Sequence, residues 1–472
     1  MGSEMCIRDS LSMVTGRDEG LYLDRINRGG SYIVLARKVS PRQALRLDSL
    51  GWNFDLRSDS RRVYPNGALL SQVLGVTNID ERGLCGIERY FDDILRGEPG
   101  WRVVQRDVDG RAHIREGLPY KPAVDGGDVI LTIDLTLQMI LEEELERALE
   151  SFRPRSANGI ILDPRTGAVL AMASLPSFDP NRYWEFPDSL RRNRTITDLF
   201  EPGSTFKVVA ASLLLEKGLA TPETVVDCKP GYVVFYGDTI GIPEKYEWLT
   251  FRDVIIHSSN VGMIRLTTGI DHDELYRHIC RFGFLGRTGI ELYGEVRGFL
   301  LEPEQWSGTT RPTVVIGHSI SATMLQMCQA YAVLANGGWM VQPRIVYGVR
   351  YPDGRFERRE SLPLRRVISS RTADTITDFL VDVVECGTGT AARVKGLEIA
   401  GKTGTANKPD LVNGGYYDNR WFSSFVGFFP ARDPAYVVMI ALDEPQGLHS
   451  VSYTHLRAHE TSLHLVCRLL LE

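Results

Sequence analysis

The sequence has no run that approaches the ~18 consecutive apolar residues of a membrane-spanning helix, and no signal-peptide pattern opens it. Its seven cysteines are scattered. They form no CxxC pair or His spacing typical of zinc, and an odd, dispersed set gives no disulfide framework. We therefore expect most of them to be small buried side chains. Acidic and basic residues are interspersed with a net charge of −6, which argues against nucleic acid or an anionic membrane surface as the main partner.

Both ends of the chain differ from the rest. The 472 residues, 43% of them hydrophobic, suffice for two or three domains with cores. However, residues 1–10 and 451–472 resemble translated sequencing-adapter sequence, and we set them aside as an artefactual leader and tail. The alternative for the tail is a genuine C-terminal helix with leucines on one side. On the artefact interpretation, the native protein begins earlier and its membrane anchor is missing from this chain.

Two regions follow one another between these ends. Residues 11–124 are rich in Arg, Asp and Gly, and Gly126-Gly127 is a reasonable hinge. Residues 125–450 begin with a strand at 129–133. A helix follows at 135–150, for which Asp134 is a plausible N-cap.

The second region has strand patterns at both of its ends. A turn at Pro164–Gly167 separates two apolar runs and predicts a hairpin. Because helical patterns occupy the middle, the region is expected to be one α+β domain whose antiparallel sheet is closed by distant segments. The expected strands are 159–162, 168–173, 398–405, 422–429 and 436–442, and the helices include 204–217 and 322–334.

The first of three short motifs is Ser204-Thr-Phe-Lys207. Glu201-Pro-Gly breaks the chain just before an apolar-periodic stretch, so Ser204 is expected at a helix N-terminus. Lys207 lies three residues on and shares its face. A buried amine can take the proton of such a serine, and the helix N-terminus stabilises developing negative charge. The ordinary alternative is that Ser204 caps the helix and Lys207 is solvated.

The other two motifs are Ser258-Ser-Asn260 and Lys402-Thr-Gly-Thr405. The first, taken alone, is typical of a loop or a helix cap. The second fits an edge strand beside a cleft. There Gly404 would let a substrate backbone approach closely. Thr403 and Thr405 offer hydroxyls, and Lys402 offers charge, for a terminal carboxylate.

The three motifs in this order resemble those of the class B penicillin-binding proteins, over roughly residues 20–450. Further matches lie at Gly317–Thr323, Arg61–Pro65 and Gly83–Glu88. The resemblance implies an α+β penicillin-binding transpeptidase domain, an antiparallel sheet flanked by helices. A smaller non-catalytic module of the pedestal or dimerisation type would precede it at 11–124.

The resemblance also implies an activity, peptidoglycan D,D-transpeptidation through a serine acyl-enzyme. Ser204 would be the nucleophile, Lys207 the base and Ser258 the proton relay, with Asn260 and Lys402 completing the catalytic set. Thr403, Gly404 and Thr405 would bind substrate, and the N–H groups of Ser204 and Thr405 would form the oxyanion hole. No metal or organic cofactor is implied.

Implied partners are stem peptides ending in D-Ala-D-Ala, β-lactams, a glycosyltransferase and other membrane proteins of the divisome or elongasome. The implied location is the extracytoplasmic face of the bacterial cytoplasmic membrane. A serine β-lactamase and a β-lactam sensor are the alternatives. The region before residue 125 argues against the first, and the absence of a membrane signalling region argues against the second.

The sequence departs from the family after residue 442, where a final helix is expected on the sheet. Asp443–Gly447 instead leads directly into the suspect tail. Buried apolar surface is worth roughly 25 cal/mol per Å², so a missing helix could exceed a domain's stability margin. We therefore predict poor folding of this chain unless residues 463–471 take the place of that helix.

Overall fold

The computed structural model groups the chain into two compact units. The first comprises residues 1–65 and 77–82, and the second comprises residues 66–76 and 83–472. The expected boundary at 124 thus lies inside the second unit, and the division into 11–124 and 125–450 stays a prediction. The structure describes residues 2–28, 33–52, 54–107, 112–235, 238–240, 246–410 and 412–446.

The first unit contains three helices, α1 (Gly2–Thr15), α2 (Glu19–Asn27) and α3 (Pro41–Ser49). Ser40 and Gln43 form a reciprocal capping box at the start of α3, and Pro41 occupies its first position. A small core of Leu11, Tyr22 and Leu47 holds the helices together. Residues 2–10, expected as a leader, lie in α1, whereas 451–472 lie outside the described residues.

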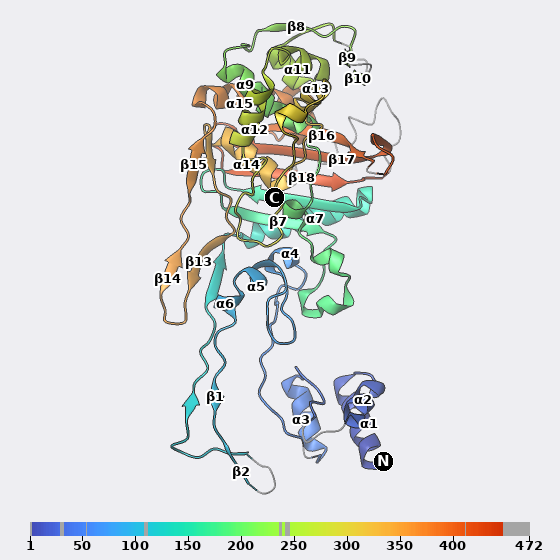
Figure 1. The fold of residues 1–472 in the computed structure, drawn as a ribbon, viewed down its shortest axis with the longest axis vertical. Helices are drawn as coiled ribbons and strands as arrows, with labels where there is room; N and C mark the ends of the chain where they lie inside the picture. Colours follow the sequence, from blue (N-terminus) through green and yellow to red (C-terminus); the bar gives the residue numbers. More distant parts are fainter. Residues whose placement is uncertain are drawn as a thin grey trace. The chain divides into compact units, whose positions relative to one another are not determined.

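The second unit is built on a five-stranded antiparallel sheet (Figure 1). The strand order is β16-β17-β18-β6-β7, so the hairpin β6–β7 pairs through β18 with strands from the other end of the chain. This confirms the prediction of one sheet closed by distant segments. The bounds are β6 (Ser156–Leu162), β7 (Val169–Leu175), β16 (Ala400–Pro409), β17 (Tyr416–Phe429) and β18 (Tyr436–Asp443).

Each face of the sheet is covered by a different set of helices. Along β18, Val437, Met439 and Ala441 join one core, whereas Val438, Ile440 and Leu442 join the other. This alternation follows from the two-residue period of a strand. Helix α7 (Leu135–Phe152) packs on the second face, and α14 (Met324–Ala335) packs on the first. The site described below lies at the edge strand β16.

Helix boundaries follow the capping signals. Asp134 accepts a hydrogen bond from the backbone N–H of Leu137 at the start of α7, as predicted. The helices expected around 204–217 and 322–334 are confirmed as α9 and α14. The other helices are α4 (Ser71–Leu74), α5 (Gly86–Tyr90), α6 (Asp92–Leu95), α8 (Arg194–Thr197), α9 (Lys207–Glu216), α10 (Phe251–Ile256), α11 (Asn260–Leu266), α12 (His272–Arg281), α13 (Thr310–Val314) and α15 (Ser370–Cys386).

The remaining strands form smaller sheets. The strand expected near 129–133 is β5, which pairs with β13 instead of joining the main sheet. Short 3₁₀ turns link several elements, and η3 (Gly203–Phe206) is the one that matters below. The strands are β1 (Trp101–Arg102), β2 (Gln105–Arg106), β3 (Ala112–His113), β4 (Tyr120–Lys121), β5 (Asp128–Leu131), β8 (Val225–Asp227), β9 (Val233–Phe235), β10 (Asp238–Ile240), β11 (Trp248–Thr250), β12 (Trp339–Val341), β13 (Val346–Arg350), β14 (Phe356–Arg358) and β15 (Pro363–Arg366).

One expectation about the cysteines is wrong. Cys228 and Cys328 are buried, but the other four within the described residues are partly or fully exposed. Cys85, Cys280 and Cys386 lie at or beside helix ends, and Cys6 lies on an exposed face of α1. No helix in the described part of the chain is both long and apolar enough to cross a membrane.

Candidate active site

Ser204 lies in the 3₁₀ turn η3, which leads directly into helix α9. Ser204 is half-buried. The residue at the cap position of η3 is Pro202, and no side chain caps the turn. Ser204 therefore lies at a helix N-terminus as predicted, but it does not cap the helix, so the ordinary alternative fails for this residue.

Lys207 is completely buried, so the alternative of a solvated first-turn lysine is wrong. Its Nζ donates to the backbone oxygen of Ser258 at 2.5 Å and lies 3.3 Å from the Ser258 hydroxyl. A buried amine favours its neutral form because burial removes the hydration that stabilises charge. The first and second motifs therefore meet at a single serine.

The two adjacent serines of the second motif have different partners. Ser259 caps α11 by accepting a hydrogen bond from the N–H of Gly262 at 2.9 Å. Ser258 has a positive φ of 60°, rare for a residue with a side chain, and its hydroxyl faces the lysines. The helix-cap interpretation is thus correct for Ser259 and leaves Ser258 available. Asn260, half-buried, is the first residue of α11.

Lys402 comes from β16 and meets the same hydroxyl. Its Nζ donates to Ser258 Oγ at 3.0 Å, to the Thr403 carbonyl at 3.3 Å and to Thr388 Oγ1 at 3.5 Å. Burial, and next the neighbouring charge of Lys207, holds the pKa of Lys402 well below its ordinary value. This buried amine faces Ser258, whereas the sequence predicted a charge presented to a substrate carboxylate.

The rest of the third motif lies along the edge of the sheet. A Cβ at Gly404 would lie 2.8 Å from Thr205 Cγ2 and 2.9 Å from the Pro202 carbonyl. Gly404 thus lets the turn that carries Ser204 pack on β16, which differs from the reason inferred from the sequence. Thr403 is buried and donates to Thr388 Oγ1 at 3.2 Å. The Thr405 hydroxyl is buried without a hydrogen-bond partner in the described part of the chain.

Two residues near the site carry no signal in the sequence. Thr388, just after α15, contacts both Lys402 and Thr403. The hydroxyl of buried Tyr331 donates to the backbone oxygen of Thr205 at 3.0 Å. Each is separated from its partner by a long stretch of sequence, so only the fold brings them together.

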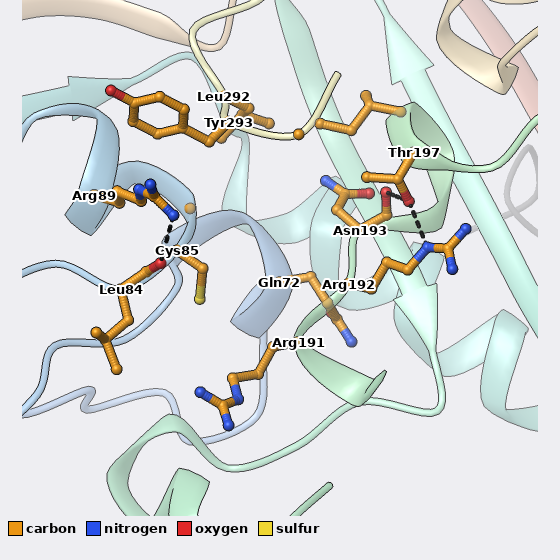
Figure 2. Close-up of a pocket in the computed structure, with 13 residues that line it drawn as sticks. Gln72, Leu84, Cys85, Arg89, Arg191, Arg192, Asn193, Thr197, Leu292 and Tyr293 are labelled. Atoms are coloured by element: carbon orange, nitrogen blue, oxygen red, sulfur yellow. Dashed lines mark hydrogen bonds between the residues drawn. The ribbon is translucent and has the colours of Figure 1, made fainter. Parts of the chain in front are cut away.

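A separate cavity of about 190 Å³ contains no residue of the three motifs, although Leu84, Cys85 and Gly86 of the Gly83–Glu88 match line it (Figure 2). Arg89, Arg191 and Arg192 line it together with Cys85 and Tyr293. Arg191 pairs with Asp188, and Arg192 pairs with Asp198 at 2.6 Å. Two of its three cations are thus neutralised by carboxylates. The cavity has no nucleophile with a base beside it.

Comparison with known families fits this fold and this site. Residues 159–461 match the penicillin-binding protein transpeptidase domain, and residues 9–131 match the penicillin-binding protein dimerisation domain. The chain therefore belongs to the penicillin-binding proteins, and a dimerisation module before the transpeptidase domain is that of class B. The predicted family and fold class are confirmed.

Individual relatives extend the comparison. The chain is 34% identical over 421 residues to stage V sporulation protein D of Bacillus subtilis, covering 87% of this chain and 64% of that protein. It is 33% identical to the peptidoglycan D,D-transpeptidase FtsI of Escherichia coli, covering 89% of this chain and 69% of FtsI. The structure of penicillin-binding protein 3 from Mycobacterium tuberculosis with aztreonam is similar, with a TM-score of 0.74, 33% identity and 85% and 89% coverage of the two chains.

Proposed function

We propose that this chain is a peptidoglycan D,D-transpeptidase that works through an acyl-enzyme on Ser204. The observation that carries the proposal is the position of the Ser258 hydroxyl. It lies 3.0 Å from Nζ of Lys402 and 3.3 Å from Nζ of Lys207, the residue that directly follows the turn carrying Ser204. Two amines and a hydroxyl in a buried site form a path along which a proton can move.

In the acylation step, Ser204 Oγ attacks the carbonyl carbon between the two terminal D-Ala residues. Lys207 accepts the hydroxyl proton as the C–O bond forms. The C–N bond then breaks, and Ser258 passes a proton to the leaving amine of D-Ala and takes in its place the proton that Lys207 received from Ser204. In the second step, an amine of a neighbouring stem peptide attacks the ester, forms the crosslink and returns the proton to Ser204.

The remaining residues of the three motifs bind and orient the substrate. The backbone N–H groups of Ser204 and Thr405 would stabilise the oxyanion. The unpartnered hydroxyl of Thr405 supports a role in binding the terminal carboxylate, because a buried polar atom without a partner is costly unless a ligand satisfies it. Asn260 would hold the substrate amide, while Thr403 and Gly404 shape the strand edge that it follows.

We also propose a domain division, a cellular location and partners for this protein. Residues 11–124 would be a non-catalytic module and 125–450 the transpeptidase domain. The enzyme would act on the extracytoplasmic face of the cytoplasmic membrane, beside a glycosyltransferase and other proteins of cell division or elongation. β-Lactams would acylate Ser204 because they mimic the D-Ala-D-Ala end.

A covalent-labelling experiment tests the nucleophile. The purified chain is incubated with a fluorescent penicillin, and the adduct is followed by intact mass over hours. We expect a long-lived adduct that Ser204→Ala abolishes and that Ser49→Ala, at an exposed serine of α3, retains. An adduct that persists in Ser204→Ala would contradict the assignment.

A second assay separates the reactions that share this chemistry. Incubation with lipid-linked precursor should release D-Ala and form crosslinked dimers. Rapid turnover of a chromogenic cephalosporin with no crosslinking would instead identify a β-lactamase. A stable adduct without any crosslinking would favour a β-lactam sensor.

A further inference from the structure

Glu201 lies three residues before Ser204, and its carboxylate is almost completely buried. The exposed fraction of the side chain is 11%. One oxygen accepts from the backbone N–H of Ser319 at 2.9 Å and from the Tyr416 hydroxyl at 3.1 Å. The other lies 2.8 Å from His318 Nδ1. A carboxylate in its ionised form only accepts hydrogen bonds, and the groups that can donate to this one are His318 Nδ1–H, the Ser319 N–H and the Tyr416 hydroxyl.

The Tyr416 hydroxyl, one of the groups that bond to the Glu201 carboxylate, keeps its proton over the whole physiological pH range. Burial, and next the charge of Glu201, raises the pKa of Tyr416 above its ordinary value. The hydroxyl therefore stays protonated and remains a donor to the carboxylate. His318 packs edge-on against the Tyr416 ring, with the centroids 5.7 Å apart, so the three side chains form one cluster.

The cluster joins three segments that are distant in the sequence. Glu201 belongs to the segment that leads into η3, Tyr416 is the first residue of β17, and His318 and Ser319 lie in the loop between α13 and α14. Two backbone hydrogen bonds of 3.0 Å connect Phe200 with Ala322 in this loop. Phe200 also stacks on Phe422 of β17, with the centroids 4.2 Å apart.

The loop meets the turn that carries Ser204 at a glycine, and the backbone is strained two residues further on. Gly317 has a φ of +85°, and a Cβ there would lie 2.0 Å from the Gly203 carbonyl oxygen. Ser319 has a φ of 58°, a conformation that costs free energy for a residue with a side chain. Such a loop keeps its shape only when its surroundings hold it, and the Glu201 carboxylate bonds directly to Ser319.

We propose that Glu201 is a positioning residue, which fixes the turn that carries Ser204 against the 317–319 loop and the start of β17. The inference rests on the proposed function and concerns the same site. Ser204 and the expected oxyanion donor of Thr405 come from different elements, so their spacing depends on how the turn is held. The cluster therefore acts on the rate of acylation more than on the binding of the β-lactam.

The test measures acylation by a fluorescent penicillin over a range of concentrations, which separates the saturating rate from the half-saturating concentration. Small displacements of reacting groups can cost about 10²-fold in rate. We expect Glu201→Gln to lower the saturating rate by about tenfold and Tyr416→Phe by about threefold, with less than a twofold change in the half-saturating concentration. Glu201→Ala should lose more than Glu201→Gln, because the amide keeps one acceptor oxygen.

Controls separate positioning from folding and from the proposed function. Tyr347→Phe, at a surface residue of β13, should acylate as the unsubstituted chain does. Tyr416→Phe removes one oxygen from a partly exposed side chain and should melt at an unchanged temperature. An unchanged saturating rate in both Tyr416→Phe and Glu201→Gln overturns the positioning role. A change in the half-saturating concentration alone, with the saturating rate unchanged, overturns it as well. Failure of the unsubstituted chain to acylate overturns the proposed function itself.

Discussion

Two groups of basic side chains lie in the second unit, in opposite surroundings. Arg191 and Arg192 pair with aspartates at the cavity of Figure 2, and their side chains are 19% and 54% exposed. Lys207 and Lys402 are completely buried, and the acceptors of Lys402 are all neutral hydroxyl or carbonyl oxygens.

The partners of the two groups differ in charge. Carboxylates neutralise the two arginines, whereas the two lysines face neutral oxygens and are the reactive group. The Arg192–Asp198 pair is exposed to solvent, and such an ion pair leaves both groups charged and contributes little to stability. Two buried amines facing one hydroxyl cannot both be charged without a large cost, so a proton is readily exchanged there. Burial and the chemistry of the partners, more than the number of basic residues, therefore mark the site.

The largest difference between the two groups is expected when one basic side chain is removed from each and the acylation rates are compared. Lys207→Met takes away the base, and general-base catalysis contributes about 10²–10⁴-fold, so acylation should fall by that factor. Arg191→Met should change acylation less than twofold. Intact-mass rates measure both. Lys207→Met also leaves the Ser258 backbone oxygen without this donor, which should lower stability by about 1–3 kcal/mol, so the rates are compared on protein that urea unfolding shows to be folded. Comparable losses in both variants would remove the distinction.

The adjacent serines allow a second comparison. Ser258→Ala should lower acylation by about 10²-fold because it removes the proton path. Ser259→Ala should keep acylation within a few-fold and cost about 1 kcal/mol of stability through the lost helix cap. Acylation kinetics and urea unfolding report the two effects. The opposite ranking would show that Ser258 is structural.

Between neutral pH and the ordinary pKa of lysine, the lysine pair is the one of the two groups that is expected to titrate. The pKa of Lys402 is depressed in the folded chain, so the unfolded chain binds more protons below the ordinary pKa of lysine. Stability should therefore rise with pH between the folded and unfolded values. Acylation should fall by up to about tenfold for each pH unit once the pair takes up its second proton. Rates that are independent of pH would contradict this assignment. Arg192→Gln should leave the profile unchanged.

The smallest effect is expected at the arginine cavity. Breaking the Arg192–Asp198 pair by Asp198→Asn should change the free energy of unfolding by less than about 1 kcal/mol, as for other exposed pairs. Urea unfolding measures it. A change of several kcal/mol would mean that this pair is not screened by solvent, and the contrast between the two groups would be weaker.

Local signals in the sequence predicted most of the fold. The cap at Asp134, the apolar run at 436–442 and the turn at Pro164–Gly167 each depend on neighbours in the chain. The i, i+3 spacing of Ser204 and Lys207 is equally local. For that reason the sequence alone identifies the motif residues, and their catalytic roles stay a prediction.

Other features depend on contacts between distant segments. The positive φ of Ser258 and the internal packing of Gly404 are set by tertiary contacts. The bonds of Thr388 to Lys402 and of Glu201 to His318 and Tyr416 join residues whose spacing carries no periodicity. The predicted loss of stability from a missing final helix concerns residues outside the described part of the chain and stays a prediction.

The strand order also determines when the site can exist during synthesis. The ribosome releases β6 and β7 early, but β18, the neighbour that connects β6 to the rest of the sheet, emerges only after β16 and β17. Until then, both outer edges of the hairpin are unpaired in this sheet, and the edge of β6 that β18 later covers is a hazard for aggregation and a natural surface for chaperones. The strand that carries Lys402 joins β6 and β7 in the sheet only after nearly all of the domain has been translated. A nascent chain would therefore be unable to react with a β-lactam until the sheet is complete.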